Sequence, residues 1–222
     1  MTGMLSEPRF VRSLAKSGAI AGVAVVLAYL LPKFIPFPGR ISTLFYVYQG
    51  PLMAFGFLGL YAFIRVHRLT VPLVTAVVFS VTSAVSRMMF LVVQINNLHY
   101  IRGYRDAAEG AELKAEWTNM LKGVFTVQNG LNIVSDVFLD LGIILFSVAC
   151  WNHPKLGKAV SIIGFVVAGL HFVLKAWTFP EPPAQAGLFD VGPYVALWPL
   201  LVCILILRNL KWMDKELGLS VR

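Results

Sequence analysis

The sequence predicts an all-α membrane protein in which six transmembrane helices form one bundle and a single domain over residues 1–222. Hydrophobic residues make up 58% of the 222 residues and charged residues only 14%, whereas a soluble domain carries about 25% charged residues. The mean hydropathy is +0.74. Six apolar runs are separated by basic or proline-containing turns, and each run is long enough to cross about 30 Å of hydrocarbon at about 1.5 Å per residue.

The first apolar run is too long for a cleaved signal peptide and lacks a small-residue cleavage site, so we interpret it as a retained span. Gly18 and Gly22 in span 1, and Gly56 and Gly59 in span 2, favour close helix packing. Pro51 lacks a backbone donor, which predicts a kink in span 2. The six predicted spans cover about residues 17–35, 41–66, 71–96, 122–151, 159–179 and 188–207.

The basic residues predict the orientation of the chain. The two termini and the turns after spans 2 and 4 hold eleven Lys and Arg residues, and the opposite side holds seven. The positive-inside rule therefore predicts that both termini are cytoplasmic. On the other side, residues 104–118 alternate between acidic and apolar residues, which predicts a short extracytoplasmic amphipathic helix between spans 3 and 4.

The net charge of +8 is concentrated at the ends of the apolar runs. Basic residues in that position interact with the membrane surface. We therefore expect membrane lipids as partners and no nucleic acid.

Span 4 carries a row of polar residues along one side. Gln128, Asn132, Asp136 and Asp140 are each four residues apart, a spacing that stacks side chains on one face of a helix. An unpaired charge at the centre of a bilayer costs roughly 3 kcal/mol or more, and ionisable residues there often mark functional sites. The row therefore predicts a polar site inside the membrane.

Two other spans carry ionisable residues at a similar predicted depth. Counting from the span ends places Arg87 of span 3, Asp136 and His171 of span 5 within about one helical turn of each other. This predicts an ion pair between Arg87 and Asp136, because an isolated ion in hydrocarbon is unfavourable. The same count places Asn132 and Lys175 one layer further out.

The roles of Lys175 and Asp140 are less determined by the sequence. Lys175 could face Asn132 and bind an anionic head group, or it could extend to the outer interface, and we favour the second interpretation. Asp140 lies one turn deeper than Asp136, with no certain partner. Two carboxylates one turn apart interact, so one of them can hold its proton near neutral pH.

Sequence motifs for known cofactors or catalytic groups are absent. No H-E-x-x-H or G-x-S-x-G motif occurs. A haem held by His99 and His171 is conceivable, but His99 lies at the outer end of span 3. We therefore predict no cofactor and no metal, and we favour a non-enzymatic role.

The leading functional hypothesis is binding of a small or lipidic molecule, with proton coupling as an open feature. The pocket would lie between spans 3, 4 and 5 and open outward beneath residues 104–118. Its residues would be Arg87, Gln128, Asn132, Asp136, Asp140, His171 and Lys175. Three alternatives remain open. The first is an intramembrane lipid hydrolase using His171 with Asp136 and Asp140. The second is an accessory or structural subunit of a membrane complex. In the third, the buried charges only fix helix register.

Several stretches resemble a group of bacterial six-helix integral membrane proteins of unknown function. These stretches are residues 136–155, residues 157–169, and the sequence Asp190-Val191-Gly192-Pro193 followed by Trp198. The resemblance extends to the topology, including the long connection after span 3. It implies a multi-pass protein of the bacterial inner membrane, and it implies no particular activity.

Overall fold

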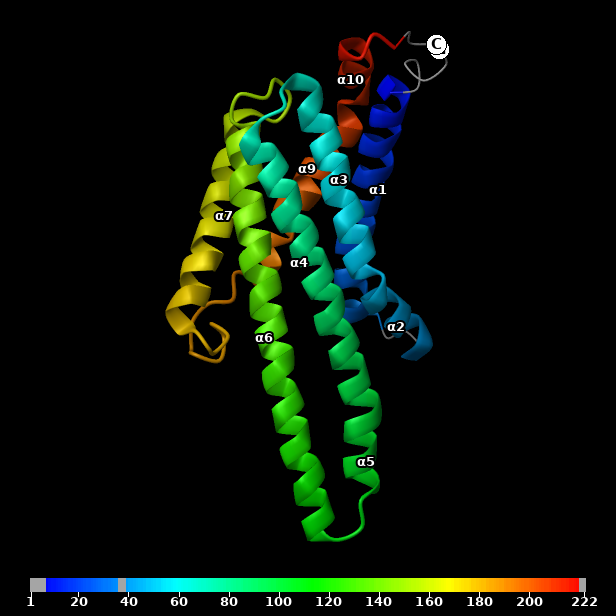
Figure 1. Cartoon of the computed structure of the whole chain (residues 1–222), viewed down its shortest axis with the longest axis vertical. Helices are drawn as coiled ribbons and strands as arrows, with labels where there is room; N and C mark the ends of the chain where they lie inside the picture. The colour runs from blue at the N-terminus through cyan, green and yellow to red at the C-terminus, as the bar shows by residue number, and fades with distance from the viewer. Residues whose placement is uncertain (1–6, 36–38, 220–222) are drawn as a thin grey trace.

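The computed structural model describes residues 7–35 and 39–219, and these residues form helices joined by turns and loops (Figure 1). The long helices run alternately up and down the molecule, and α9 crosses between them. In chain order the elements are α1 (Glu7–Phe34), α2 (Gly39–Val47), α3 (Gln49–His67), α4 (Val71–Asn96), the π-helix η1 (Asn97–Ile101), α5 (Arg102–Ala107), α6 (Ala111–Cys150), α7 (Gly157–Thr178), α8 (Gly192–Val195), α9 (Leu197–Arg208) and α10 (Leu210–Glu216).

Among the described residues, five helices are long and apolar enough to cross a membrane. They are those of predicted spans 1 to 5. A sixth crossing results if the segment 192–208 is counted with α10, from which it is bent by 61°. The prediction of a helical, multi-pass membrane protein is thus confirmed, with five or six crossings.

Predicted span 2 is two helices rather than one. The break falls at Tyr48, between α2 and α3, and α2 turns away from the axis of α3 in Figure 1. Pro51 explains the position of the break, because it has no N–H to donate to the carbonyl of Val47 and its ring would clash with that carbonyl. The proline effect was expected, but the prediction of one continuous helix over residues 41–66 was wrong.

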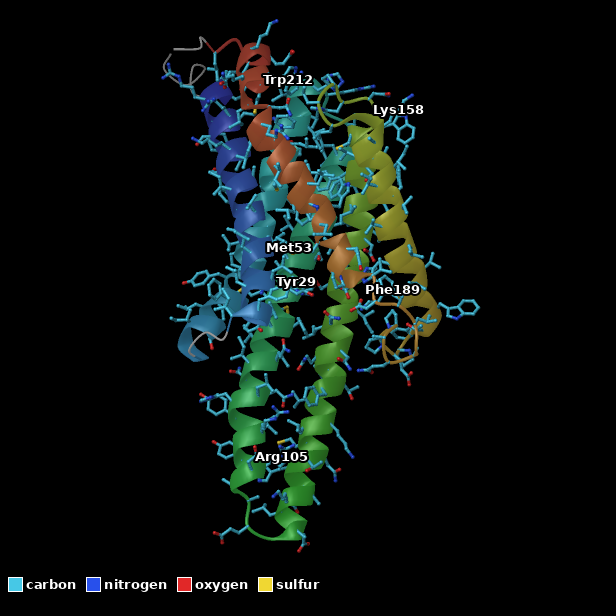
Figure 2. All side chains as sticks on the ribbon, turned by 180° about the vertical axis from the view of Figure 1, so that it is seen from behind. Tyr29, Met53, Arg105, Lys158, Phe189 and Trp212 are labelled. Carbon is cyan, nitrogen blue, oxygen red and sulfur yellow. The ribbon has the colours of Figure 1, made fainter. Side chains whose placement is uncertain are left out.

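The prediction of a separate amphipathic helix at residues 104–118 was also wrong. The chain reverses at residues 108–110, where Gly110 has a φ of 88°. Residues 111–118 are instead the first turns of α6, which has 40 residues and is about 60 Å long. Together with η1 and α5, α6 forms a two-helix hairpin that projects beyond the other helices, with Arg105 near its tip (Figure 2).

The close packing expected of the glycines in spans 1 and 2 is confirmed. A Cβ atom built on Gly18 would lie 2.5 Å from the Cα of Gly59, and one on Gly56 would lie 3.0 Å from the Cα of Gly22. The backbones of α1 and α3 therefore touch directly at two levels. Small residues allow this contact, which gains dispersion energy where no hydrophobic effect acts between helices.

Hydrogen bonds and ion pairs join the remaining helices. Ser83 of α4 donates to the carbonyl of Ser135 of α6 at 2.7 Å, and the Ser135 hydroxyl donates back to the carbonyl of Ser83 at 3.2 Å. At the end of the bundle opposite the hairpin, the Arg12 guanidinium pairs with Asp214 of α10. The start of α1 and the last helix therefore lie at the same end of the molecule.

Candidate functional site

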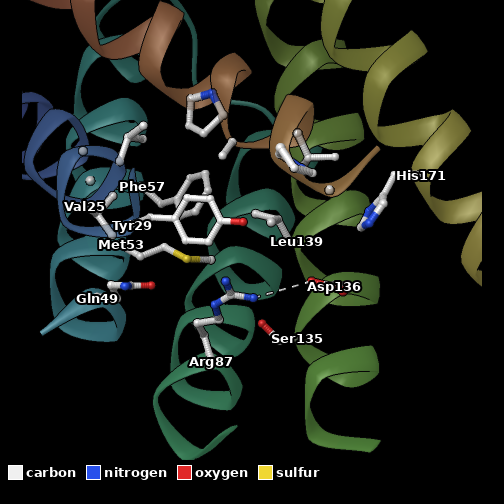
Figure 3. A pocket seen from close by; sticks show the side chains of 18 of the residues that line it. Val25, Tyr29, Gln49, Met53, Phe57, Arg87, Ser135, Asp136, Leu139 and His171 are labelled. Atoms are coloured by element: carbon white, nitrogen blue, oxygen red, sulfur yellow. Dashed lines mark ion pairs between the residues drawn. The ribbon is translucent and has the colours of Figure 1, made fainter. Parts of the chain in front are cut away.

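A cavity of about 270 Å³ lies between the helices (Figure 3), and two of its lining residues, Tyr29 and Met53, lie in the half of the bundle nearer the hairpin (Figure 2). Its polar wall comes from α4, α6 and α7, and its apolar wall from α1, α3, α8 and α9. The polar wall holds Arg87, Asn132, Ser135, Asp136, His171 and Lys175. The apolar wall includes Val25, Met53, Phe57, Leu60, Val195 and Pro199.

Asp136 is the centre of the polar wall. Its Oδ2 lies 2.7 Å from Nζ of Lys175 and accepts a hydrogen bond from Nδ2 of Asn132 at 3.3 Å. Its Oδ1 lies 3.9 Å from Nη1 of Arg87. The Asp136 side chain is 11% exposed and that of Lys175 is 8% exposed. A single buried carboxylate is therefore shared by two cations.

Asp140 has a partner of its own. Both of its carboxylate oxygens lie within hydrogen-bond distance of Nδ1 of His171, at 2.8 and 3.0 Å, and both side chains are buried. A carboxylate can only accept, so Nδ1 of His171 carries a proton. In the neutral ring Nε2 is then the acceptor. A methyl group at Gly192 would lie 3.7 Å from Nε2, so this nitrogen is directed towards the start of α8.

The two pairs show that the expected depth of α7 was wrong by one helical turn. We predicted His171 at the level of Asp136 and Lys175 at the level of Asn132. The structure pairs His171 with Asp140 and Lys175 with Asp136, a shift of four residues in both cases. Because the shift is the same for both pairs, one error in register accounts for both corrections.

Lys175 does not extend to the interface, contrary to the interpretation we favoured. Its ammonium group is buried against Asp136, where the closest carboxylate oxygen is 2.7 Å away. Lys175 lies one turn before the end of α7 at Thr178. A fixed carboxylate within reach stabilises the ammonium group better than a longer path to water does.

Arg87 is held more loosely than Lys175. Its side chain is 23% exposed, and Nη1 donates to Oδ1 of Asn132 at 3.3 Å. The guanidinium carbon lies 5.9 Å from the ring centre of Tyr29 and 5.4 Å from that of Phe90. Figure 3 shows the guanidinium group pointing into the cavity. The Arg87–Asp136 ion pair that we predicted is therefore present, but it is long.

Gln128 lies outside the residues that line the cavity. Its side chain is buried, and its Oε1 has no hydrogen-bond partner among the described residues. His99 is exposed and contacts the ring of Tyr100, so it does not share a site with His171. The helical spacing placed Gln128 on the correct face of α6 but gave no information on where the cavity ends.

Sequence reasoning missed part of the cavity. Asp190 lines it, is exposed, and accepts a hydrogen bond from the backbone N–H of Gly192 at 2.9 Å. We named Asp190 only within the stretch that resembles other bacterial membrane proteins. The apolar wall was missed because apolar residues are common on every span, and only the helix packing shows which of them face an internal space.

Within the part of the chain that the structure describes, no group of three or more His, Cys, Asp or Glu side chains is arranged to hold a metal ion. The site offers ion-pair and hydrogen-bond chemistry instead. Two cations can bind an anion, and Nε2 of His171 can accept or donate a proton.

Comparison with known proteins gives no match to a family model, to a curated protein or to a solved structure. The function is therefore argued from the geometry of the cavity alone.

Proposed function

We propose that this multi-pass membrane protein binds a small or lipidic molecule in the cavity between α1, α3, α4, α6, α7 and α9. The supporting observation is the division of the cavity into a charged wall and an apolar wall. Ligand pockets usually combine a largely apolar lining with a few fixed polar groups. The volume of about 270 Å³ is just below the usual range for ligand pockets, about 300–1,000 Å³.

The arrangement of charges also supports a binding site over a purely structural ion pair. A structural pair needs one cation and one carboxylate in close contact, and Lys175 with Asp136 fulfils this at 2.7 Å. Arg87 is additional, at 3.9 Å from the same carboxylate. Ionisable residues within membrane spans often mark sites for substrates or ions, and a second cation beside the cavity fits such a site.

The experiment compares a cavity-filling variant with a matched control on the same helix. Val25 lines the cavity, whereas Leu27 is exposed on the outer surface of α1. We expect V25W to lose the small molecules that native mass spectrometry detects on wild-type protein purified in mild detergent. L27W should retain them. Equal occupancy in both variants, or no bound molecule in the wild type, contradicts the proposal.

The second candidate is a lipid hydrolase, and the His171–Asp140 pair is the observation that favours it. A histidine held by a carboxylate at 2.8 Å is the arrangement of a general base. Hydrolysis of fluorogenic fatty-acid esters by the wild type, abolished in H171Q, would support this function. Metal analysis of the same sample separates the two candidates further, because a stoichiometric metal contradicts binding alone.

We further propose that the protein resides in a bacterial inner membrane with both termini in the cytoplasm and the hairpin outside. The start of α1 and helix α10 lie at the same end of the molecule, where Arg12 pairs with Asp214. The hairpin projects from the other end of the molecule. Labelling of cells with a membrane-impermeant maleimide tests the orientation. We expect E112C to react in intact cells and K215C to react only after permeabilisation, and the reverse result contradicts the orientation.

A further inference from the structure

We infer that the occupant of the cavity is an anionic amphiphile whose carboxylate or phosphate group binds at Arg87 and whose apolar body lies against α1, α3 and α9. This inference rests on the proposal that the cavity binds a ligand. It adds the chemical class of the ligand and the position of its head group. Three observations carry it: the long distance from Arg87 to its carboxylate, the unused donors of Arg87, and the shape of the cavity.

The two cations that face the cavity are not equally well paired. Lys175 and Arg87 share Asp136, and His171 is already paired with Asp140. Asp190 also lines the cavity, but it is exposed and its Oδ1 is bound to the backbone N–H of Gly192. Arg87 is therefore the cation of this wall without a close carboxylate, at 3.9 Å from Asp136 against 2.7 Å for Lys175, and an anion supplies one.

Arg87 has the donors to bind that anion. A guanidinium group has five N–H donors, and Arg87 makes one hydrogen bond among the described residues, to Asn132 at 3.3 Å. The rings of Tyr29 and Phe90 lie beside the guanidinium carbon at 5.9 and 5.4 Å and restrict its position. A planar guanidinium with free donors is suited to bidentate binding of a carboxylate or phosphate.

The opposite wall suits an apolar chain. Val25, Met53 and Phe57 lie on the side of the cavity away from Asp136 and His171 in Figure 3, and Leu139 of α6 lies between the two sides. A volume of about 270 Å³ equals roughly nine water molecules at their liquid volume. This space fits a head group and a chain of roughly six to eight carbons, so a longer lipid chain would extend out of the cavity.

The test uses probes that share one chain and differ in the head group. The full-length protein in maltoside detergent is titrated with octanoate, octyl phosphate, octanol and octylamine, and binding is measured by calorimetry. We expect octanoate or octyl phosphate to bind at least about tenfold more tightly than octanol, as a charge-assisted hydrogen bond implies, and octylamine to bind most weakly. The order of octanoate and octyl phosphate distinguishes a fatty acid from a phosphate ester. Inorganic phosphate shows whether the apolar chain is required.

Variants locate the head group. We expect R87Q to lose the preference for octanoate over octanol while octanol binding stays unchanged. R105Q is the matched control, because Arg105 pairs with Asp106 in the hairpin and does not line the cavity. D136N should bind octanoate more tightly than the wild type does, because both cations then lack their internal carboxylate.

The outcomes separate this inference from the proposed function. If octanol and octanoate bind the wild type equally, or octylamine binds best, the anionic class is wrong while binding in the cavity stands. If none of the probes binds and V25W behaves as the wild type, the proposed function fails as well. Because the wild-type series alone decides the class of ligand, the inference is testable even if R87Q does not fold.

Discussion

Lys175, rather than Arg87, is expected to be the cation that stabilises Asp136 in the folded protein. The distances of 2.7 Å to Lys175 and 3.9 Å to Arg87 correspond to about 6 and about 4 kcal/mol of Coulomb attraction at an effective dielectric constant of about 20. Removing the charges from water offsets most of this energy. Arg87 is also more exposed, with 23% of its side chain accessible against 8% for Lys175.

Double-mutant cycles measure the difference between the two cations. We expect a coupling energy of about 2–3 kcal/mol between Lys175 and Asp136 and about 1 kcal/mol or less between Arg87 and Asp136, within the range found for contacting residues. The single variants K175M, R87M and D136N, and the two double variants with D136N, are unfolded with sodium dodecyl sulfate and followed by circular dichroism. A coupling for Arg87 equal to or larger than that for Lys175 refutes the reasoning. It would make Arg87 a structural residue.

Two further predictions concern the fold. G59A should destabilise the protein by about 1–3 kcal/mol, because the added Cβ would lie 2.7 Å from the Cα of Gly18. G169A, a helical site with nothing within 4 Å of the new Cβ, should be neutral or stabilising by up to about 1 kcal/mol, and equal effects of the two variants contradict the packing argument. Burial lowers the pKa of His153 from 6.5 to about 4, with a smaller contribution from the charge of His67. The unfolded chain therefore takes up this proton first as the pH falls. The free energy of unfolding, measured in urea titrations, should drop by about 3 kcal/mol between pH 6.5 and 4. The variant H153N keeps an acceptor for the backbone N–H groups of residues 155 and 156. It should show a smaller drop in parallel titrations.

The membrane class and the small-residue packing faces of α1 and α3 could be predicted from the sequence because each depends on local composition. Long apolar runs identify membrane spans without knowledge of their partners. Gly18, Gly22, Gly56 and Gly59 lie at spacings that place small residues on one face of each helix. In both cases the pattern within one segment carries the information, and no relative position of two segments is needed.

The pairing of the buried charges depends on the relative depth of two helices, and the sequence does not determine this depth to within one turn. We placed the middle of span 4 from an expected start near residue 122, but α6 begins at Ala111 and continues through the membrane without a break. The ends of α6 therefore do not mark the ends of its membrane-embedded part. A displacement of four residues moves a side chain by about 6 Å, which is enough to exchange His171 for Lys175 beside Asp136.

The hairpin had a signal in the sequence that we did not use. No proline occurs between residues 111 and 150, and this stretch forms one helix. Tyr104 and Trp117 meet across the hairpin with ring centres 5.0 Å apart, and they stand on either side of Gly110 in the sequence. Two helical stretches joined by a short loop are the arrangement of a helical hairpin.

The one-turn shift also changes which residue needs a functional explanation. With Asp136 at the level of His171, Asp140 would be a buried carboxylate without a partner, and the site would attract cations or hold a proton. In the structure both aspartates are paired at 2.7 and 2.8 Å, with Lys175 and His171. The cation without a close carboxylate is then Arg87, 3.9 Å from Asp136 and next to a cavity lined on its other side by apolar side chains. A cation within a membrane span that lacks a close counter-ion is unfavourable, and an anion in the cavity is the arrangement that offsets this cost.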